Sequence, residues 1–495
     1  MAQPEKNISI DLARAVSFLK DIGLIKKQET STLNSEKSNI HTDSRAVAKG
    51  DIFIAYRGES TDSHKFIPDV MVKRPGLVII EDPSFIDQLK DTPWILVENS
   101  REAWSYLCAE ASDFSSNEMT FIGVTGTNGK TSTVWIIKEL LKLQNIPYLS
   151  IGTLGIWMND EFYESKHTTP DPNVLFPLLS DAAKQGISVC VMEVSSHAME
   201  QRKLAPIRFK ASAFTSFSRD HLDLHGDMDH YLEAKLKLFR NLQERDSFKL
   251  FHSSLFRLAA VSKLKLPGMK KYGLENNLSY TFRNGVSELQ IREPDCDRVF
   301  TLPLLGSFLI ENAAAAILLL EATLNTKIKL ETTNKIKPIP GRLELVRRTD
   351  KEQPTVVVDY AHTPDAIEKS LQALRPFCSG DLTVVFGCGG NRDKGKRPLM
   401  AKSAEQFADK VVVTTDNPRD EDPHDIINDI LDGFLDRSEI TVEVDRKKAI
   451  ESAIAQASSK DLILVAGKGH ETYMEISGKR THFSDTEVAQ NALRS

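Results

Sequence analysis

The chain has 495 residues, of which 41% are hydrophobic and 27% are charged, and its formal net charge is −6. This composition is that of an ordinary globular protein, and the length corresponds to about three domains. Charges of both signs are interspersed, so we expect no nucleic-acid partner and no polybasic membrane contact.

Targeting segments and cysteine content indicate the cellular compartment of a protein. The N-terminus lacks a basic region followed by an apolar run, and we find no apolar stretch of 18 residues, so we expect neither a signal peptide nor a membrane span. The cysteines are odd in number and form no C-x-x-C pair. This pattern predicts reduced thiols in a cytosolic protein. They are Cys108, Cys190, Cys296, Cys378 and Cys388.

The first 117 residues alternate short strand-like runs with helical stretches. We expect helices over residues 11–22 and 101–111, and strands over residues 51–55, 76–80 and 94–97. The polar segment 112–117 is typical of a linker. We therefore expect a first α/β domain that ends at about residue 117.

A glycine loop after this linker is the strongest motif in the chain. An apolar run leads into Gly126-Thr-Asn-Gly-Lys-Thr131, and a helical pattern follows at once. Backbone N–H groups in such a loop stabilise phosphate before a helix N-terminus. Lys130 adds a charge for the β/γ-phosphates, and Thr131 offers a hydroxyl to Mg²⁺. The loop is a shortened form, because Val124 stands where the usual pattern has its first glycine. The order of strand, loop and helix still favours ATP or GTP binding over a plain glycine turn.

Acidic and histidine residues follow in the middle third. The apolar run 187–192 ends in Glu193, where nucleotide-binding folds place an acid for Mg²⁺; an acid that caps the next helix is an equal alternative. Residues 219–230 hold the densest group, and its side chains at 220, 221, 223 and 225 can converge on cations. A dinuclear metal hydrolase is a weaker alternative, because it needs a second histidine-rich cluster that the sequence lacks. The helical pattern 231–239 gives Lys235 no special role by itself.

The last third has the clearest rhythm. Residues 245–300 lack a clean period and predict irregular β-rich structure, and a boundary falls near residues 337–341. Five strand-like runs then alternate with helical patterns, which predicts a parallel, doubly wound sheet. These runs are 355–358, 382–386, 410–414, 440–444 and 462–466.

Polar motifs stand directly after four of these runs. Open α/β sheets bind ligands outside the carboxyl ends of their strands, so we expect a binding surface at this edge, although each motif could also be a simple turn. Arg419 is notable, because a guanidinium can hold a carboxylate bidentately. The motifs are Asp359–His362, Gly387–Gly390, Asp416–Arg419 and Gly467–Glu471.

Taken together, these motifs resemble the Mur ligase family of peptidoglycan synthesis, in order and over nearly the whole chain. The anchors are residues 126–131, 192–197, 218–223, 340–344, 359–364 and 469–471. Asp416-Asn-Pro-Arg419 is similar to the motif of members that add diaminopimelate, and lysine-adding members lack its arginine. The resemblance implies an α/β protein of three domains. These are a UDP-sugar-binding domain over 1–117, a central P-loop ATPase-like parallel-sheet domain over 118–338, and a Rossmann-like amino-acid-binding domain over 339–495.

The resemblance also implies a reaction. ATP phosphorylates the γ-carboxylate of D-Glu in UDP-N-acetylmuramoyl-L-Ala-D-Glu, and the amino group of meso-diaminopimelate attacks the acyl phosphate. It implies Mg²⁺ as cofactor and a carbamate on Lys235, which would turn a cation into an anionic oxygen ligand. A cytoplasmic monomer is the implied form.

Site residues carry over by position in these motifs. The resemblance implies catalytic roles for Lys130, Glu193, His221 and Lys235. The implied metal ligands are Thr131, Glu193, His221 and carbamylated Lys235. ATP would contact Gly126, Thr127, Asn128, Gly129, Lys130, Thr131, Ser132, Asn312, Arg342 and Asp359. The UDP-muramoyl dipeptide would contact Ser44 (within the turn 43–45), Thr168, Thr169, Ser195, Gln201 and Lys203. Diaminopimelate would contact Arg392, Asp416, Asn417, Arg419, Gly467 and Glu471.

The chain departs from the family's pattern at four positions, where another residue replaces an arginine, two asparagines and a glycine: Lys203, Ser216, Leu309 and Ser63, respectively. Alternatives within the same chemistry are an L-lysine-adding ligase and a folylpolyglutamate-synthase-like ligase. The latter would lack both the Asp-Asn-Pro-Arg motif and the first domain. A nucleotide-driven switch would hydrolyse ATP without an acceptor. A non-enzymatic binding module has no use for Lys130, Glu193 and His221 together.

Overall fold

The computed structural model describes residues 8–31, 33, 36–58, 61–89, 92–283, 286–293, 297–346, 350 and 352–494. The chain divides into two units. Unit 1 consists of Met1–Gly123, Ile146–Ser212 and Ala234–Ser247. Unit 2 consists of Val124–Asn145, Ala213–Glu233 and Phe248–Ser495.

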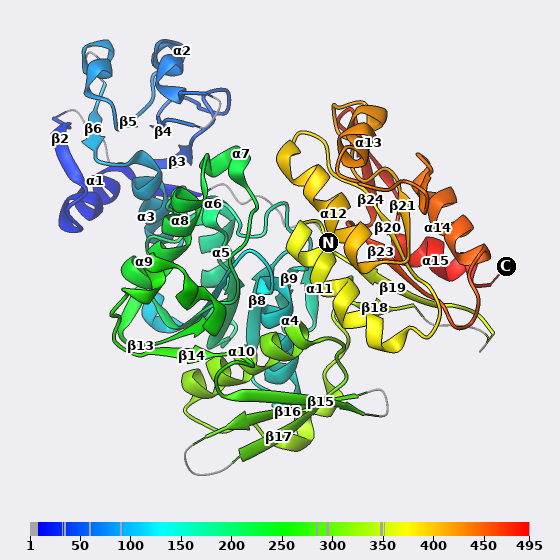
Figure 1. The fold of residues 1–495 in the computed structure, drawn as a ribbon. Coiled ribbons are helices and arrows are strands. Elements are labelled where there is room, and N and C mark those ends of the chain that lie inside the picture. Colours follow the sequence, from blue (N-terminus) through cyan, green and yellow to red (C-terminus); the bar gives the residue numbers. More distant parts are fainter. Residues whose placement is uncertain are drawn as a thin grey trace. The chain divides into compact units, whose positions relative to one another are not determined.

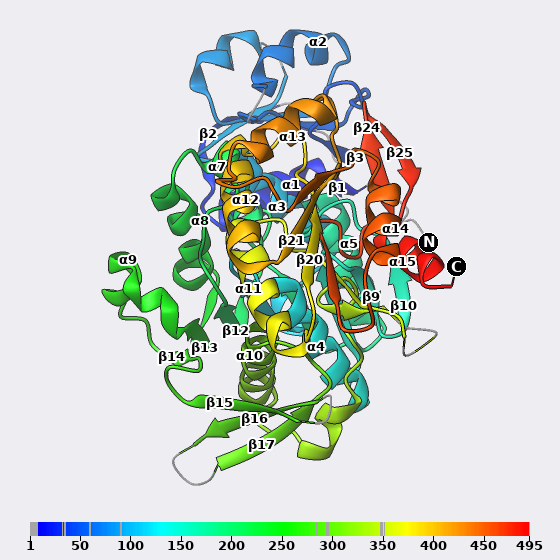
Figure 2. The same cartoon turned by 45° about the vertical axis from the view of Figure 1, so that its right-hand side comes forward.

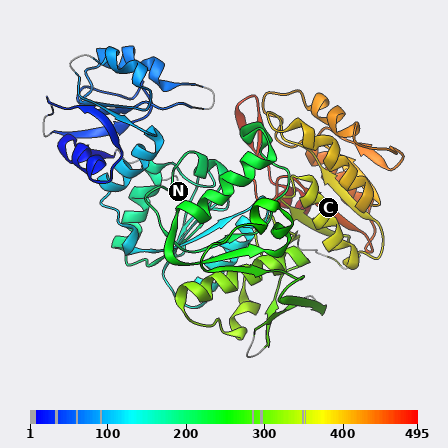
Figure 3. The same cartoon turned by 60° about the vertical axis from the view of Figure 1, so that its left-hand side comes forward.

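The first sheet is formed by the N-terminal residues (Figure 3, blue). Its order is β1-β3-β4-β5-β6-β2, with parallel pairing from β3 to β6 and antiparallel strands at both edges. The strands are β1 Ser9–Asp11, β2 Ile25–Glu29, β3 Lys37–His41, β4 Ile52–Ile54, β5 Leu77–Ile80 and β6 Trp94–Val97. The helices are α1 Leu12–Asp21, α2 Ile67–Val72 and α3 Ser100–Ala111. The predicted strands and helices are confirmed; β1, β2 and β3 were not predicted.

The central sheet has eight strands in the order β10-β9-β8-β11-β7-β12-β13-β14. The pairs β8·β11 and β13·β14 are parallel, while β8, β9 and β10 form an antiparallel edge. The strands are β7 Thr120–Thr125, β8 Tyr148–Gly152, β9 Gly155–Met158, β10 Glu161–Tyr163, β11 Val189–Glu193, β12 Phe209–Phe214, β13 Gln243–His252 and β14 Met269–Tyr272. The helices in this part of the chain are α4 Lys130–Leu143, α5 Pro172–Lys184, α6 Ser196–Glu200, α7 Leu222–His225, α8 Met228–Asn241 and α9 Ala259–Ser262.

Helix α10, Ser307–Leu324, packs against both α4 and a small antiparallel sheet (Figure 1). That sheet consists of β15 Leu278–Arg283, β16 Val286–Arg292 and β17 Asp297–Leu302, in a region where we predicted irregular β-rich structure. Contrary to our reading of the sequence, α10 is by length and composition long and apolar enough to cross a membrane. Most of it is buried inside the structure, which is typical of a core helix.

The C-terminal sheet confirms the predicted parallel arrangement. Its order is β18-β19-β23-β20-β21-β22, and only β18 of its strands pairs antiparallel. In Figure 2, α11 and α12 lie on one face and α14 and α15 on the other. The strands are β18 Glu344–Leu345, β19 Thr355–Asp359, β20 Leu382–Phe386, β21 Lys410–Val413, β22 Ile440–Val442 and β23 Leu462–Ala466, followed by the hairpin β24 Tyr473–Ile476 and β25 Lys479–His482. The helices are α11 Pro364–Leu374, α12 Arg397–Phe407, α13 Pro423–Leu431, α14 Arg446–Ala455 and α15 Asp485–Ala492.

The cysteines in the described residues are free thiols, as predicted: Cys108, Cys190, Cys378 and Cys388. Cys296 lies outside the described residues.

Candidate functional site

The glycine loop joins β7 to α4, as the sequence predicts. Gly126 and Gly129 have φ angles of 150° and 88°, which L side chains rarely adopt. A Cβ atom would lie 2.2 Å from the Thr215 hydroxyl at Gly126 and 2.6 Å from Oδ1 of Asn312 at Gly129. The loop is therefore too tightly packed for any other residue at these two positions.

Lys130 lies over the same loop. Its Nζ donates hydrogen bonds to the carbonyl oxygens of Gly126 (2.8 Å) and Thr127 (2.9 Å). The hydroxyl of Thr127 in turn accepts a bond from the N–H of Ser218 at 3.1 Å. The ammonium group is thus held at the loop, where a phosphate group would meet it.

A cavity of about 220 Å³ in unit 2 brings together most of the predicted ATP-binding residues. Nη2 of Arg342 donates to the Thr131 hydroxyl at 3.2 Å, whereas its buried Nε has no hydrogen-bond partner in the described part of the chain. This unmatched donor fits an anionic or polar ligand. The cavity is lined by Asn128, Gly129, Ser132, Asn312, Arg342 and Asp359, and also by His252, Glu311 and Lys369, which the motifs did not indicate.

Asp359 closes one side of this cavity from the end of β19. Its carboxylate accepts hydrogen bonds from the N–H of Leu343 (2.7 Å) and the hydroxyl of Ser370 (3.2 Å). Burial raises the pKa of Asp359, although Arg342 opposes the rise. Its two bound oxygens keep the carboxylate in one orientation, which suits a contact with a ribose hydroxyl.

Glu193 ends β11 with its side chain only 1% exposed. It accepts hydrogen bonds from the N–H (2.7 Å) and the hydroxyl (3.2 Å) of Thr153. The helix-capping alternative is wrong, because the Ser195 hydroxyl caps α6 by accepting from the N–H of Ala198 at 3.1 Å. A buried carboxylate at a strand end is the kind of oxygen ligand that Mg²⁺ takes.

The acidic and histidine cluster at residues 220–225 does not converge as expected. Among the residues that the structure describes, no three His, Cys, Asp or Glu side chains are arranged to hold a metal ion. Asp220 lies 3.4 Å from Nε2 of His221, 3.6 Å from Nζ of Lys396 and 3.8 Å from Nε2 of His362, and the His225 ring packs against Tyr231. Although burial acts against it, the electrostatic attraction of His221 and Lys396 holds the pKa of Asp220 well below its usual range. The dinuclear hydrolase alternative therefore has no ligand set within the described part of the chain.

The remaining catalytic candidates are divided between the units. Lys235 lies on α8 and is 1% exposed, in the same unit as Glu193. Lys130 and His221 belong to the other unit. His221 has a φ of 53°, in the left-handed region that non-glycine residues adopt uncommonly.

The residues expected to hold the muramoyl dipeptide meet around Glu193. The Thr169 hydroxyl donates to the Glu193 carbonyl at 2.9 Å and accepts from the N–H of Ser195 at 3.3 Å. The hydroxyls of Thr168 and Thr153 are 3.2 Å apart. Lys203, which replaces an arginine, is buried and pairs with Asp171 at 2.7 Å, so a cation still stands at that position.

Two other members of this set make contacts away from Glu193. Gln201 contacts the ring of His197 at the end of α6. Ser44 follows β3, and its carbonyl oxygen accepts a bond from Nζ of Lys73 at 2.9 Å. In the same turn, the guanidinium of Arg45 holds the pKa of Asp43 at about 2.

The other departures from the family's pattern have visible consequences. The Ser216 hydroxyl donates to the carbonyl of Asn128 (3.0 Å) and accepts from its N–H (2.9 Å), so it supports the glycine loop. The Ser63 hydroxyl makes the same reciprocal pair of bonds with the backbone of Tyr56. Leu309 is buried in the core and does not line the cavity.

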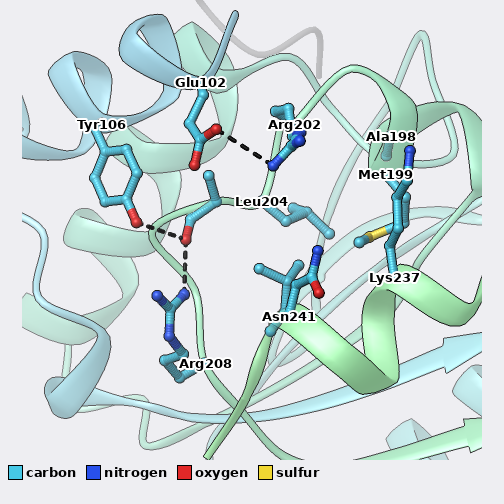
Figure 4. A pocket seen from close by; sticks show the side chains of 11 residues that line it. Glu102, Tyr106, Ala198, Met199, Arg202, Leu204, Arg208, Lys237 and Asn241 are labelled. Atoms are coloured by element: carbon cyan, nitrogen blue, oxygen red, sulfur yellow. Dashed lines mark hydrogen bonds and ion pairs between the residues drawn. The ribbon is translucent and has the colours of Figure 1, made fainter. Parts of the chain in front are cut away.

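A smaller cavity of about 80 Å³ lies beside the segment 198–208 in unit 1 (Figure 4). The Tyr106 hydroxyl and Nη1 of Arg208 both donate to the carbonyl of Ala205, at 3.2 and 2.7 Å. Arg202 pairs with Glu102 at 3.3 Å, and Lys237 pairs with Glu200 at 2.6 Å. The bonds that Tyr106 and Glu102 make therefore fasten the segment 198–208 to α3.

The predicted amino-acid pocket is assembled from three strand ends of the C-terminal sheet. Nδ2 of Asn417 donates to Oε2 of Glu471 at 2.8 Å, and a Cβ atom on Gly467 would lie 2.6 Å from Oδ2 of Asp416. Nη1 of Arg419 donates to the Gly390 carbonyl at 2.7 Å. The side chains of Arg419 and Arg392 both approach Gly389. The expectation that the strand-end motifs lie together is thus confirmed for the motifs after β20, β21 and β23.

An ion pair between Arg397 and Glu421 holds the segments next to this pocket. Arg397 is fully buried, and its guanidinium nitrogens lie 3.0 and 3.1 Å from the Glu421 carboxylate. Glu421 also accepts the N–H of Asn391. The side-chain hydrogen bond from Arg397 lowers the pKa of Glu421 to about 2.

We expect Glu421→Gln to lower the unfolding temperature at pH 7 by about 5 °C, because a charge-assisted hydrogen bond of about 2 kcal/mol is lost. The carboxylate's contribution is fully present above pH 4.5 and is lost as the pH falls through about 2, so the difference from wild type should shrink between about pH 4.5 and pH 2. Thermal unfolding followed by near-UV circular dichroism at several pH values measures both effects. Glu451→Gln, in an exposed pair with Lys447, is the matched control and should change little. A pH-independent difference would contradict the assignment.

Comparison with known proteins adds independent findings. Models of the Mur ligase middle domain and of the Mur ligase glutamate ligase domain match residues 124–320 and 341–469. The UDP-N-acetylmuramoyl-L-alanyl-D-glutamate–2,6-diaminopimelate ligase of Coxiella burnetii is 39% identical over 467 residues, which cover 92% of this chain and 95% of the relative. A solved structure of a ligase of the same name is 31% identical with a TM-score of 0.61, covering 92% of this chain and 94% of that chain.

A more distant structure bears on one alternative. Folylpolyglutamate synthase of Mycobacterium tuberculosis, solved with ADP and AMPPCP, has a TM-score of 0.60 at 17% identity. It covers 74% of this chain and 92% of that chain. At this identity the likeness shows a common fold and nothing more.

Proposed function

Because the chain belongs to the Mur ligase family, whose members are ATP-dependent acid–amino-acid ligases, we propose that it adds meso-diaminopimelate to the D-Glu γ-carboxylate of UDP-N-acetylmuramoyl-L-Ala-D-Glu. The observation that carries the choice of amino acid is the placement of Arg419. Its guanidinium is anchored at the strand-end pocket beside Arg392, Asn417 and Glu471. Diaminopimelate differs from lysine by a second carboxylate, which a guanidinium can hold bidentately.

The nucleotide end of the reaction rests on the glycine loop and the 220 Å³ cavity. The loop amides and Lys130 hold the β- and γ-phosphates and stabilise the charge of the transferring phosphoryl group. Arg342 contributes its unmatched Nε–H, and Asn312 and Asp359 orient the nucleoside. Most of the catalytic effect then comes from positioning and from electrostatic stabilisation of the phosphoryl group.

Mg²⁺ belongs to the chemistry of this family, and its oxygen-ligand preference fits Thr131 and Glu193. We assign His221 and a carbamylated Lys235 to a second metal ion. When bound, Mg²⁺ would neutralise part of the phosphate charge. The carbamate would give the buried Lys235 side chain an oxygen ligand in place of a cation.

The carboxylate and amine substrates meet different residues. Thr168, Thr169 and Ser195 offer hydroxyl groups to the muramoyl dipeptide, together with Gln201, the cation of Lys203 and, in the first domain, Ser44. In the amino-acid pocket, Arg419 and Arg392 meet carboxylates, while Asp416 and Glu471 meet ammonium groups. The amine then attacks the acyl phosphate, and phosphate leaves from the tetrahedral intermediate.

We further propose domain boundaries at about residues 117 and 338, with a UDP-sugar-binding, an ATP-binding and an amino-acid-binding domain. A cytoplasmic monomer fits the free thiols of the described cysteines.

The test of the function is phosphate release from ATP and Mg²⁺ with the UDP-muramoyl dipeptide and meso-diaminopimelate, L-lysine or no amino acid. We expect release only with diaminopimelate, together with a tripeptide product of the corresponding mass. Release with L-lysine would keep the family and overturn the pocket assignment. Release without any acceptor would favour a nucleotide-driven switch.

Carbamylation of Lys235 makes a separate prediction. Removal of dissolved CO₂ and bicarbonate should lower activity by about 10-fold or more, because a metal ligand is lost, and bicarbonate should restore it. ¹³C-labelled bicarbonate should give a carbamate signal in the ¹³C NMR spectrum of the protein. Lys235→Met should lack this signal. Lys237→Met is the control, because Lys237 lies two residues further along the same helix α8, and it should keep the signal. Full activity and no signal in wild type would show that the lysine is unmodified.

A further inference from the structure

Lys468 is the second residue of the Gly467-Lys-Gly-His-Glu471 motif, and its side chain is fully buried. Its Nζ donates hydrogen bonds to Oδ1 of Asn417 and to Oε2 of Glu471, both at 3.0 Å. The same nitrogen lies 3.9 Å from Oδ1 of Asp416. Lysine is almost never fully buried unless it is paired, and here every one of these partners belongs to the proposed amino-acid pocket.

The two carboxylate oxygens of Glu471 differ in their surroundings. Oε2 accepts hydrogen bonds from Lys468 and from Nδ2 of Asn417. Oε1 accepts no hydrogen bond from any residue that the structure describes. The side chain is 16% exposed, so one oxygen is held by the protein and the other is left for a ligand that donates hydrogen bonds.

Asn417 is oriented by the same lysine. Its Oδ1 accepts from Lys468 and from the N–H of Glu475 (3.0 Å), so its Nδ2 must point to Glu471. The lysine therefore fixes Glu471 twice, once directly and once through the amide of Asn417.

Several charged groups near Glu471 act on its pKa, and Lys468 is one that lowers it. Burial and the like charge of Asp416 raise the pKa of Glu471, whereas Lys468 and Asn417 act to lower it. Arg446 is another cation near Glu471, but its guanidinium is held by Asp485 at 2.7 and 2.8 Å. The pKa values of Tyr360 and Tyr473 are raised, chiefly by burial, so these hydroxyls stay neutral.

Arg480 stacks on Tyr473 and pairs with Glu475 at 3.1 Å, so its charge is engaged by Glu475. Among the residues that the structure describes, Lys468 is thus the cation in hydrogen-bond contact with Glu471.

We propose that Lys468 is a positioning residue for the amino-acid substrate, because it keeps Glu471 an anion with Oε1 directed to a substrate ammonium group. This inference rests on the proposed function, in which Glu471 meets that ammonium. Without the lysine, the carboxylates of Asp416 and Glu471 would lose the cation that both lie near, and Glu471 would take up a proton and lose its attraction for a cation.

The first experiment compares Lys468→Met with wild type over pH 6 to 9.5. At pH 7 we expect KM for diaminopimelate to rise by about 10-fold, with KM for ATP and for the UDP-muramoyl dipeptide within about 2-fold of wild type. The ratio of variant to wild-type KM should fall as the pH rises, because Glu471 regains its charge; taking the ratio removes the titration of the substrate amines. A ratio that is constant with pH, or an equal loss for ATP, would overturn the proposal.

A double-mutant cycle identifies the partner. Glu471→Gln removes the same charge, so Lys468→Met/Glu471→Gln should have a KM for diaminopimelate no more than about 2-fold above that of Glu471→Gln alone. Independent, multiplying effects would show that Lys468 does not act through Glu471.

The double-mutant cycle still tests the proposal if the single variant Lys468→Met folds poorly. Lys468→Met leaves two carboxylates without their cation, whereas the double variant leaves only one buried charge, so the double variant should unfold at the higher temperature. The reverse order would contradict the coupling. If Lys468→Met does not fold, the KM comparison of the double variant with Glu471→Gln still decides the proposal.

Wild-type assays separate the two levels of failure. Phosphate release by wild type without an acceptor would overturn the proposed function and this inference with it. Wild-type ligation of diaminopimelate combined with an unchanged KM in Lys468→Met would overturn the inference alone.

Discussion

Lys130→Met should lower kcat/KM for ATP by a factor of about 10² to 10³, the largest loss we expect from one substitution. The Lys130 ammonium is held against the glycine loop by bonds to two loop carbonyls at 2.8 and 2.9 Å. It is therefore in place before nucleotide binds and needs no reorganisation during phosphoryl transfer. Methionine keeps the length and the packing of the stem but removes the charge.

The measurement is initial-rate phosphate release over a range of ATP concentrations, together with the unfolding temperature. Lys142→Met is the matched control, because Lys142 lies in the last turn of the same helix α4. The control should retain kcat/KM within about 2-fold. A Lys130→Met enzyme with near wild-type kcat/KM would remove the loop from the phosphate-binding role.

Arg419→Ala should raise KM for meso-diaminopimelate by about 50-fold, since hydrogen bonds between charged groups contribute about 1.5 to 3 kcal/mol. Arg419 has a φ of 52°, a conformation that a non-glycine residue adopts only when its surroundings hold it. Bonds from its N–H to the Glu475 carbonyl (3.1 Å) and from the N–H of Ser477 to its own carbonyl (2.7 Å) do so. The hairpin β24–β25 thus sets the direction of the guanidinium.

Arg419→Lys separates charge from geometry. It keeps the positive charge but loses the planar fork, so we expect KM to stay at least about 10-fold above wild type. KM for ATP should not change in either variant. Arg437→Ala, an exposed arginine of the same sheet region, is the control. An Arg419→Ala enzyme with unchanged KM for diaminopimelate would show that another group holds the second carboxylate.

The parts of the structure that could be predicted from the sequence are those whose conformation is determined by a few consecutive residues. The run from β7 through the glycine loop into α4 was predicted because strand, loop and helix are adjacent and each has its own local signal. The parallel C-terminal sheet was predicted because its strands are buried apolar runs separated by helical patterns. Strands β2 and β3 were missed because they are largely polar, and β2 is an edge strand.

The middle cluster shows how sequence proximity can mislead. Asp220, His221, Asp223 and His225 are close in the chain, yet they form no ligand set among the described residues: Asp220 lies 3.4 Å from His221, while the rings of His221 and His225 pack against Tyr231. Asp220 is paired with Lys396 and His362, more than 140 residues away, and no short motif could indicate those contacts. Family resemblance supplied the roles of His221 and Lys235, which spacing alone did not.

The sequence by itself determined the local elements of chemistry: a phosphate loop, an acid at a strand end and polar motifs after parallel strands. Only the tertiary structure decided which of these meet, because that depends on contacts between distant segments. Arg342 reaches Thr131 across 211 positions, and Asn128 reaches Asp365 across 237. Lys468 is the plainest case. In the sequence it is one lysine within a turn, and its burial between Asp416, Asn417 and Glu471 follows only from the order in which β20, β21 and β23 pair.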